Sequence, residues 1–270
     1  MHGTLVFFKN TIPSSFQIYQ QIGRFTEPLC TTCFVIQQDV MYFCTYRIVS
    51  TGVREVSISD DVDHLNSLLP LKARQDALDP ALRDLHQQIL RSFAATGRPL
   101  SREQIAAQSG ADRVDDLLAQ LAADDLVVLS ADMQEITGAY PFTIEERVHH
   151  VDVNGQAVYA MCALDALSIA PMCQASTRIL SSCHVTGTPI DIQMNADKVL
   201  VAIPADVHVG IRWQATSGCA AKNLCMEMVY IKDAATAKAW QQQDNDNISI
   251  YSLNEAVEFG AAFFKPLLAA

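Results

Sequence analysis

The sequence is poor in positive charge and has no long apolar runs. Only 19 Lys and Arg residues stand against 30 Asp and Glu residues, which gives a formal net charge of −11. This balance disfavours a nucleic-acid or anionic-membrane partner, because neutralising phosphates requires clustered cations. No stretch reaches the ~18 uninterrupted apolar residues of a membrane span. The start, MHGTLVFFKNTIPSS, lacks a basic segment, so we expect no signal peptide.

Several familiar catalytic motifs are also missing. The chain contains no G-x-x-x-x-G-K-[ST], G-x-G-x-x-G, H-E-x-x-H or G-x-S-x-G. These absences remove the commonest nucleotide-binding, zinc-protease and serine-hydrolase interpretations. Apolar material is ample: 50% of the 270 residues are hydrophobic, enough for one large domain or two moderate ones.

Composition divides the chain into four parts and predicts an α+β fold. Residues 1–63 carry β-branched and aromatic segments, which favour a β-rich N-terminal extension. Residues 64–80 are polar and end in ALDP, as expected of a linker. Residues 81–135 predict three helices and then a strand, the order of a winged-helix unit. Residues 136–270 predict a compact domain of mixed antiparallel sheet and helices.

The winged-helix-like segment is predicted to be structural. Its second helix has a capping box, Ser101 with Gln104, and Gly110 as its C-cap. Its third helix, within 111–125, has one cation, Arg113, and five aspartates. A recognition helix of that charge would be repelled by phosphate, so we expect no nucleic-acid partner.

The apolar segment YAMCALDAL contains a cysteine and an aspartate three residues apart, Cys162 and Asp165. On a helix beginning near Met161 these two side chains share one face. The helix N-terminus should favour a thiolate, whereas apolar surroundings should raise the pKa of the carboxyl towards that of a proton carrier. A core cysteine beside a capping aspartate explains the same spacing, and both interpretations remain open.

The other cysteines in the second half carry weaker signals. Without an export signal we expect the reducing cytosol, where thiols stay free. Cys225, in NLCMEMVYI, is by itself typical of a buried apolar residue, and Cys173 has no distinctive context. Cys219 lies beside a glycine in an expected loop. Cys183 precedes a histidine on an expected strand, where neighbours face opposite ways, so we interpret it as structural.

A separate group lies near the N-terminus. Cys30 and Cys33 form a C-x-x-C pair, with Cys44 behind them. Two thiols at that spacing can chelate a soft metal or form a redox pair. His64 is the nearest later candidate for a fourth zinc ligand. A metal role for this group is a hypothesis, with simple packing as its alternative.

Taken together, these segments resemble the alkylmercury (organomercurial) lyase family. VYAMCALDAL closely resembles a hallmark segment of that family. GRPLSREQIA with ADRVDDLLAQL, SSCHVTGTPI, NLCMEMVYI and ISIYSLNEAVEFGAAFF follow in the same order as their family counterparts. The resemblance covers about residues 80–270, and residues 1–79 have no counterpart. Two local departures stand out: Met161 where the family often has Trp, and Glu227 to Ile231 in place of H-V-H-F-F.

The resemblance implies protonolysis of carbon–mercury bonds in a cytoplasmic detoxification enzyme. Cys162 and Cys225 would be the catalytic, mercury-binding thiols, Asp165 the proton carrier beside the metal, and Cys183 a structural residue. The substrate would be a small organomercurial, and no resident cofactor would be needed. Low-molecular-weight thiols or a mercury reductase would accept the Hg(II). A non-catalytic, thiol-based protein that binds or senses heavy metals is the alternative.

Overall fold

The computed structural model describes residues 33–37, 40–44, 57–214 and 218–269. The chain forms two compact units, Met1–Arg54 and Glu55–Ala270. In the first, β1 (Cys33–Gln37) pairs antiparallel with β2 (Val40–Cys44), and the backbone of Cys33 lies opposite that of Cys44. These strands agree with the predicted β character, and Cys30 lies outside the described residues.

The second unit begins with helices where a linker was expected. α1 (Ile58–Leu68) and α2 (Leu71–Ala77) cover most of residues 58–77, so the prediction of a linker over 64–80 is wrong. Ser57 caps α1 by accepting from the backbone N–H of Asp60. The leucines of this segment are buried in the main core, which explains why it is ordered: Leu65, Leu69, Leu71 and Leu78.

The next helices follow the predicted pattern. They are α3 (Pro80–Thr96), α4 (Arg102–Ser109) and α5 (Val114–Ala123), with a 3-10 turn (η1, Ala111–Arg113) between the last two. The capping box of Ser101 and Gln104 is present. Gly97 ends α3 at φ +72°, and a Cβ there would lie 2.4 Å from the carbonyl oxygen of Ala157, so both conformation and space require glycine. The winged-helix assignment stays a prediction.

One eight-stranded antiparallel sheet runs through the centre of this unit. Its order is β10-β9-β8-β6-β7-β5-β4-β3. A hairpin turn at Asn154-Gly155 joins two of its strands, with positive φ at both residues, as a type I′ turn requires. The strands are β3 (Val128–Leu129), β4 (Ile136–Ala139), β5 (Phe142–Thr143), β6 (His149–Val153), β7 (Gln156–Ala160), β8 (Ser176–Ser182), β9 (Pro189–Asn195) and β10 (Lys198–Ile203).

A smaller sheet with the order β12-β11-β13 completes the fold. Its strands are β11 (His208–Arg212), β12 (Met228–Ile231) and β13 (Ile248–Ser252). Two short 3-10 turns, η2 (Ala220–Lys222) and η3 (Leu224–Glu227), lead into β12. The remaining helices are α7 (Ala234–Gln241), α8 (Leu253–Phe264) and the 3-10 turn η4 (Lys265–Leu267).

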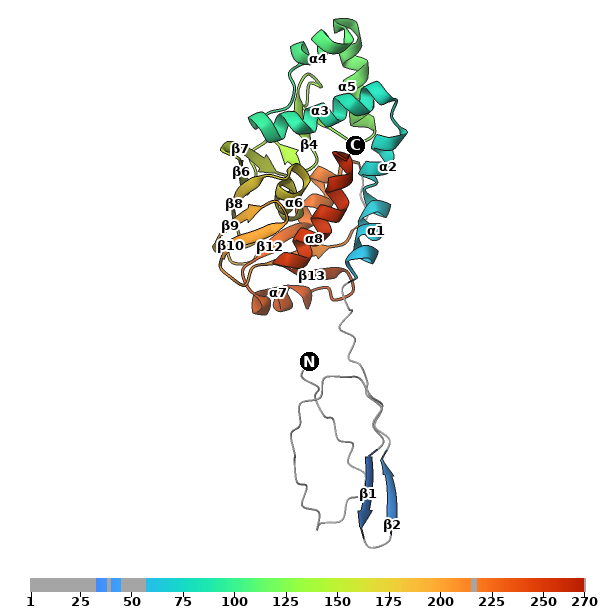
Figure 1. Cartoon of the computed structure of the whole chain (residues 1–270), viewed down its shortest axis with the longest axis vertical. Coiled ribbons are helices and arrows are strands. Elements are labelled where there is room, and N and C mark those ends of the chain that lie inside the picture. The colour runs from blue at the N-terminus through green and yellow to red at the C-terminus, as the bar shows by residue number, and fades with distance from the viewer. Residues whose placement is uncertain (1–32, 38–39, 45–56, 215–217, 270) are drawn as a thin grey trace. The chain divides into compact units, whose positions relative to one another are not determined.

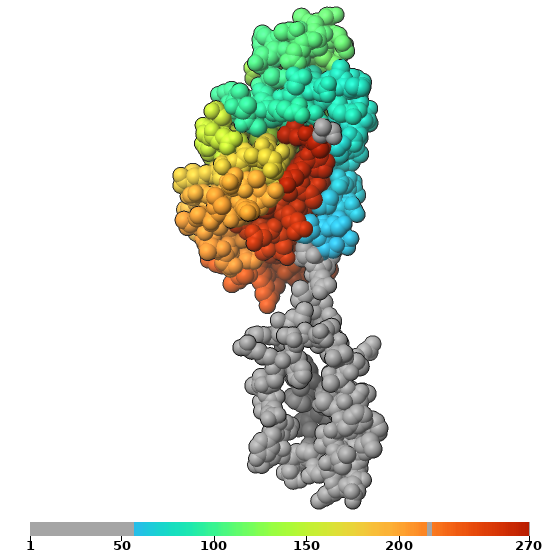
Figure 2. Space-filling view, viewed as in Figure 1, coloured from blue at the N-terminus to red at the C-terminus, as the bar shows by residue number. Residues whose placement is uncertain are grey.

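Helix α6 (Ala163–Cys173) lies at the centre of the second unit, with every residue except Cys173 buried. It packs alongside α8, which in turn lies against α1 (Figure 1). The close approach of α6 and α8 depends on Gly260, where a Cβ would lie 2.2 Å from Ser168 Oγ. Figure 2 shows α8 on the surface of this face of the unit. The architecture confirms the predicted α+β class, and none of the described helices is long and apolar enough to cross a bilayer.

Candidate active site

Cys162 stands at the junction between a strand and the central helix. Strand β7 ends at Ala160. Cys162 then forms the N-cap of α6, with extended backbone at φ −150°. Its Sγ accepts the backbone N–H of Asp165 at 3.3 Å. The thiol therefore has the position that Ser or Asp usually occupies at a helix start.

Asp165 lies in the first turn of α6 and is almost completely buried, with 2% of its surface exposed. Its Oδ2 has no hydrogen-bond partner among the described residues. A buried carboxylate oxygen without a donor is costly, so the fold favours the protonated form of this group. The sequence-based expectation of a carboxyl in apolar surroundings is therefore correct.

Cys225 arrives from a distant part of the chain, in the turn η3 just before β12. The preceding turn is fixed by two hydrogen bonds from its backbone. The N–H of Ala220 donates to Asp125 Oδ2 at 3.2 Å, and the N–H of Ala221 donates to the Tyr140 hydroxyl at 2.9 Å. Because Tyr140 also donates to Asp125 Oδ1, these contacts tie the Cys225 segment to the end of α5.

The three side chains meet in one place. The sulfurs of Cys162 and Cys225 and a carboxylate oxygen of Asp165 all lie within 4.8 Å of one another. All three residues are buried. Among the described residues, this is the one group of three or more Cys, His, Asp or Glu side chains close enough to share a metal ion. Two sulfurs and one carboxyl oxygen favour a soft metal over Mg²⁺ or Ca²⁺.

Both thiols are protonated at neutral pH. Burial raises the pKa of Cys162 well above its usual range, and the neighbouring Cys225 and Asp165 add to that effect. The Cys162 thiol lowers the pKa of Cys225, but burial and the Asp165 charge outweigh it and the net pKa is raised. The expectation of a helix-stabilised thiolate at Cys162 is therefore wrong, because loss of hydration outweighs the single backbone N–H.

Asp165 behaves as the sequence suggested. Burial raises its pKa from 3.8 to about 7, although the Cys162 thiol and backbone partly offset the effect. A carboxyl with that pKa exchanges a proton readily at neutral pH. The site thus has three groups that can exchange a proton, two thiols and one carboxyl, and all three are buried.

Two further residues belong to this site and were not singled out from sequence. Met228 opens β12 and its Sδ lies 3.7 Å from Cys162 Sγ. Tyr230, two residues on along the same strand, is fully buried, and its hydroxyl has no hydrogen-bond partner among the described residues. Residues two apart on a strand share a face. The alternation of side chains along the strand could have placed Met228 and Tyr230 on one face. Assigning that face to the site would also have required knowing that β12 packs against α6.

The remaining cysteines lie outside this group. Cys183 is buried after β8, where its backbone N–H donates to the carbonyl of Thr188, and Cys173 ends α6 at the far end of the helix. His64, the suggested fourth ligand for the N-terminal cysteines, stacks on Trp213 with ring centroids 4.5 Å apart. No contact in the described residues supports a metal at that histidine.

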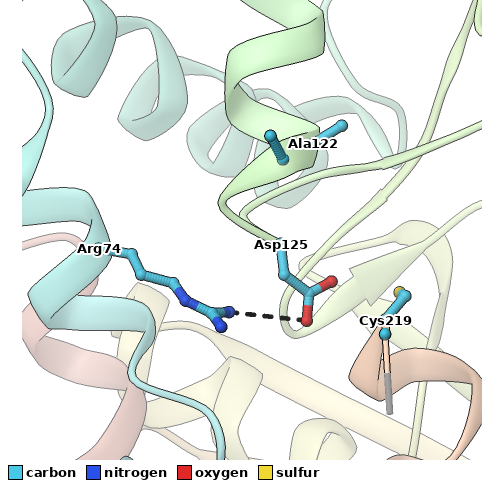
Figure 3. Close-up of a pocket in the computed structure, with 6 residues that line it drawn as sticks. Arg74, Ala122, Asp125 and Cys219 are labelled. Carbon is cyan, nitrogen blue, oxygen red and sulfur yellow. Dashed lines mark ion pairs between the residues drawn. The ribbon is translucent and has the colours of Figure 1, made fainter.

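Cys219 lines an open pocket of about 440 Å³, formed by Arg74, Ala122, Ala123, Asp125, Gly218 and Cys219 (Figure 3). Arg74 Nη1 lies 3.7 Å from Asp125 Oδ2 across this pocket. The Cys219 sulfur lies 3.5 Å from the Tyr140 hydroxyl. The pocket therefore sits over the network that anchors the Cys225 segment, and the catalytic candidates themselves are not in its lining.

Comparison with known proteins finds similarity to alkylmercury lyases. The family model of alkylmercury lyase matches residues 142–265. The alkylmercury lyase of Streptomyces lividans is 27% identical over 179 residues, covering 66% of this chain and 81% of that protein. The alkylmercury lyase of Staphylococcus epidermidis (strain ATCC 12228 / FDA PCI 1200) is 27% identical over 173 residues, covering 63% and 77%.

The fold has a close counterpart among solved structures. The crystal structure of the mercury-bound form of MerB2 aligns with a TM-score of 0.63 and 22% sequence identity, covering 74% of this chain and 98% of that chain. The matched family region contains Cys162, Asp165 and Cys225. Residues 142–265 of this chain therefore match the alkylmercury lyase family model, and the chain is similar to alkylmercury lyases over about two thirds of its length.

Proposed function

We propose that this protein is an organomercurial lyase that replaces the carbon–mercury bond of R–Hg⁺ with a carbon–hydrogen bond. The observation that carries the proposal is the approach of Cys162, Cys225 and Asp165 to within 4.8 Å of one another in a buried site. Mercury prefers thiolate ligands, and cleavage of its bond to carbon requires a proton at the leaving carbon. This site offers both.

The first step is exchange of one thiol proton for the metal. One cysteine sulfur bonds to R–Hg⁺, and its proton passes to the Asp165 carboxylate or leaves as H⁺. The raised pKa of Asp165, about 7, makes the carboxyl a suitable proton carrier, because a group with a pKa near the ambient pH can both accept a proton and give it up. The product of this step is R–Hg–S, with the organic group still attached.

The second step breaks the carbon–mercury bond. The other thiol gives up its proton through Asp165 and its sulfur bonds to mercury, which increases electron density on the carbon. The carbon takes the proton and leaves as R–H, while Cys162 and Cys225 keep Hg(II) between them. Overall, R–Hg⁺ and two thiols give R–H, a dithiolate complex of Hg(II) and one H⁺. Because the fold holds the two thiols and the carboxyl close together, the reaction does not depend on encounters between separate molecules in water.

Release of the metal needs a partner. We propose that two external thiols, from low-molecular-weight thiols or a mercury reductase, exchange with the cysteines and carry Hg(II) away. No resident cofactor enters any of these steps. Both sulfurs are buried, so an incoming thiol must first gain access to the site.

Hydrocarbon release tests the proposal. The full chain is incubated with phenylmercury and excess thiol, and benzene is measured by gas chromatography. Cys162→Ser and Cys225→Ser should each abolish benzene release, whereas Asp165→Ala should still bind phenylmercury and fail to cleave it. Cys173→Ser is the matched control, because it alters the other end of the same helix, roughly 15 Å away at the usual helical rise.

The alternative, a non-catalytic protein that binds or senses heavy metals, predicts a different result. Binding of phenylmercury by the wild-type chain without benzene release would favour it over the lyase. Retention of a buried acid beside the thiols supports the enzyme, since a chelating site has no use for a proton carrier.

A further inference from the structure

Met228 brings a third sulfur to the candidate site. Its Sδ lies 3.7 Å from Cys162 Sγ, and its side chain is 3% exposed. It directly follows the turn that carries Cys225, so the chain delivers both residues together. The neighbouring Met226 is different: it is 52% exposed, and its sulfur lies 3.6 Å from Arg147 Nη1.

The separation of the two sulfurs is that of ligands on one metal ion. Two sulfurs bonded tetrahedrally to zinc at about 2.3 Å each lie ~3.8 Å apart. A slightly larger soft ion fits the same pair with a small shift of the side chains. A thioether is soft and polarizable, and it offers a lone pair without losing a proton. Met228 is thus chemically suited to contact a mercury atom held by Cys162.

We propose that Met228 is a mercury-binding residue, whose thioether contacts the metal alongside Cys162 and Cys225. The inference rests on the proposed function and deepens it by naming a third sulfur in the site. Met228 would hold the substrate metal while a thiol still carries its proton, and it would retain Hg(II) after the hydrocarbon leaves. Its contribution should appear in metal affinity more than in the cleavage step.

A packing role for Met228 predicts a different outcome for the same substitution. Met→Leu conserves volume in a core and usually costs less than about 1.5 kcal/mol. If the side chain only fills space, Met228→Leu should fold and bind mercury like the wild type. If the sulfur contacts the metal, the same variant should fold normally and lose affinity.

The experiment measures Hg(II) binding to the full chain by competition with a thiol of known mercury affinity. In Met228→Leu the dissociation constant for Hg(II) should rise about tenfold or more, because loss of a group that only supports a metal ligand already costs about 10–100-fold in metal affinity. The matched control, Met226→Leu, removes a thioether two positions away on the surface and should leave the constant unchanged.

A spectroscopic measurement tests the contact directly. The chain is labelled with methyl-¹³C methionine, and the Met228 resonance is identified by its loss in Met228→Leu. One equivalent of Hg(II) should shift that resonance, while the Met226 resonance, identified in the same way, should stay in place. A Met228 resonance that does not move on mercury binding would overturn the inference.

The outcomes separate this inference from the proposed function. If Met228→Leu binds Hg(II) like wild type while Cys162→Ser and Cys225→Ser lose it, the Met228 contact is refuted and the lyase proposal stands. If the wild-type chain itself fails to bind Hg(II), both are refuted together.

Discussion

Replacing Asp165 with asparagine should remove a pH dependence of stability that is built into the fold. Burial raises the pKa of this carboxyl from 3.8 to about 7. Between these values the folded state keeps a proton that the unfolded state has lost. The free energy of unfolding therefore falls as the pH rises through this range. The contribution is fully present below about pH 4 and is lost above about pH 7.

The expected size follows from the shift. Each tenfold change in proton affinity corresponds to about 1.36 kcal/mol, so a carboxyl moved from 3.8 to about 7 loses about 4 kcal/mol across the range. The variant Asp165→Asn has nearly the same shape and no titrating group. The wild-type free energy of unfolding minus that of the variant should thus fall by about 4 kcal/mol between pH 4 and pH 8.

Tryptophan fluorescence during urea unfolding is a suitable assay. The chain has 2 tryptophans, Trp213 and Trp240, and both lie in the second unit, so the signal reports that unit. Burial also lowers the pKa of His86 and His149 to about 4, but both histidines are present in wild type and variant and cancel in the difference. A difference that stays constant within about 1 kcal/mol from pH 4 to pH 8 would refute a buried, proton-holding Asp165.

Three further predictions concern single side chains. Tyr230→Phe removes a buried hydroxyl that has no hydrogen-bond partner among the described residues, and it should raise the free energy of unfolding by about 1 kcal/mol. Tyr140→Phe breaks hydrogen bonds to Asp125 and Ala221 and should lower it by about 1–2 kcal/mol. Urea unfolding of both variants checks this, and equal effects would contradict it. Cys183→Ser should cost about 1–3 kcal/mol of stability yet leave benzene release intact, so loss of turnover in a folded variant would refute its structural role. Gly260→Ala should lower the melting temperature despite better helix propensity, because its Cβ would overlap Ser168 Oγ; Ser168→Ala in the same chain should recover part of the loss, and no recovery would count against this contact.

Local sequence signals predicted the helices and turns of the second unit well. The capping box of Ser101 with Gln104 and the C-cap at Gly110 depend on residues close in sequence, and both appear as predicted. The segment 64–80 was assigned wrongly because its polar residues suggested a linker. Its leucines bury against distant helices, and that contact is invisible to composition.

In the candidate site, too, local features could be predicted from the sequence, whereas features that depend on distant segments could not. The shared face of Cys162 and Asp165 follows from helical spacing, and the pairing with Cys225 came from resemblance to a family. The direction of the Cys162 pKa could not be predicted from the helix start alone. It depends on how completely three chain segments exclude water, which only the assembled fold determines.

Met228 and Tyr230 were missed for a related reason. Their alternation along a strand was visible, but nothing in the sequence says that β12 presents this face to the start of α6. The contact between Met228 Sδ and Cys162 Sγ joins residues 66 positions apart. Contacts of this kind, between residues far apart in the sequence, form much of the site, and local sequence patterns do not reveal them.

A structure of the wild-type chain loaded with one equivalent of Hg(II) tests the central claim most directly, because it shows which sulfur atoms bond to the metal. The account predicts one mercury atom bonded to Cys162 Sγ and Cys225 Sγ, with the Asp165 carboxyl beside it. Mercury bound at Cys219 or Cys173, with the Cys162 and Cys225 sulfurs free of metal, would contradict it.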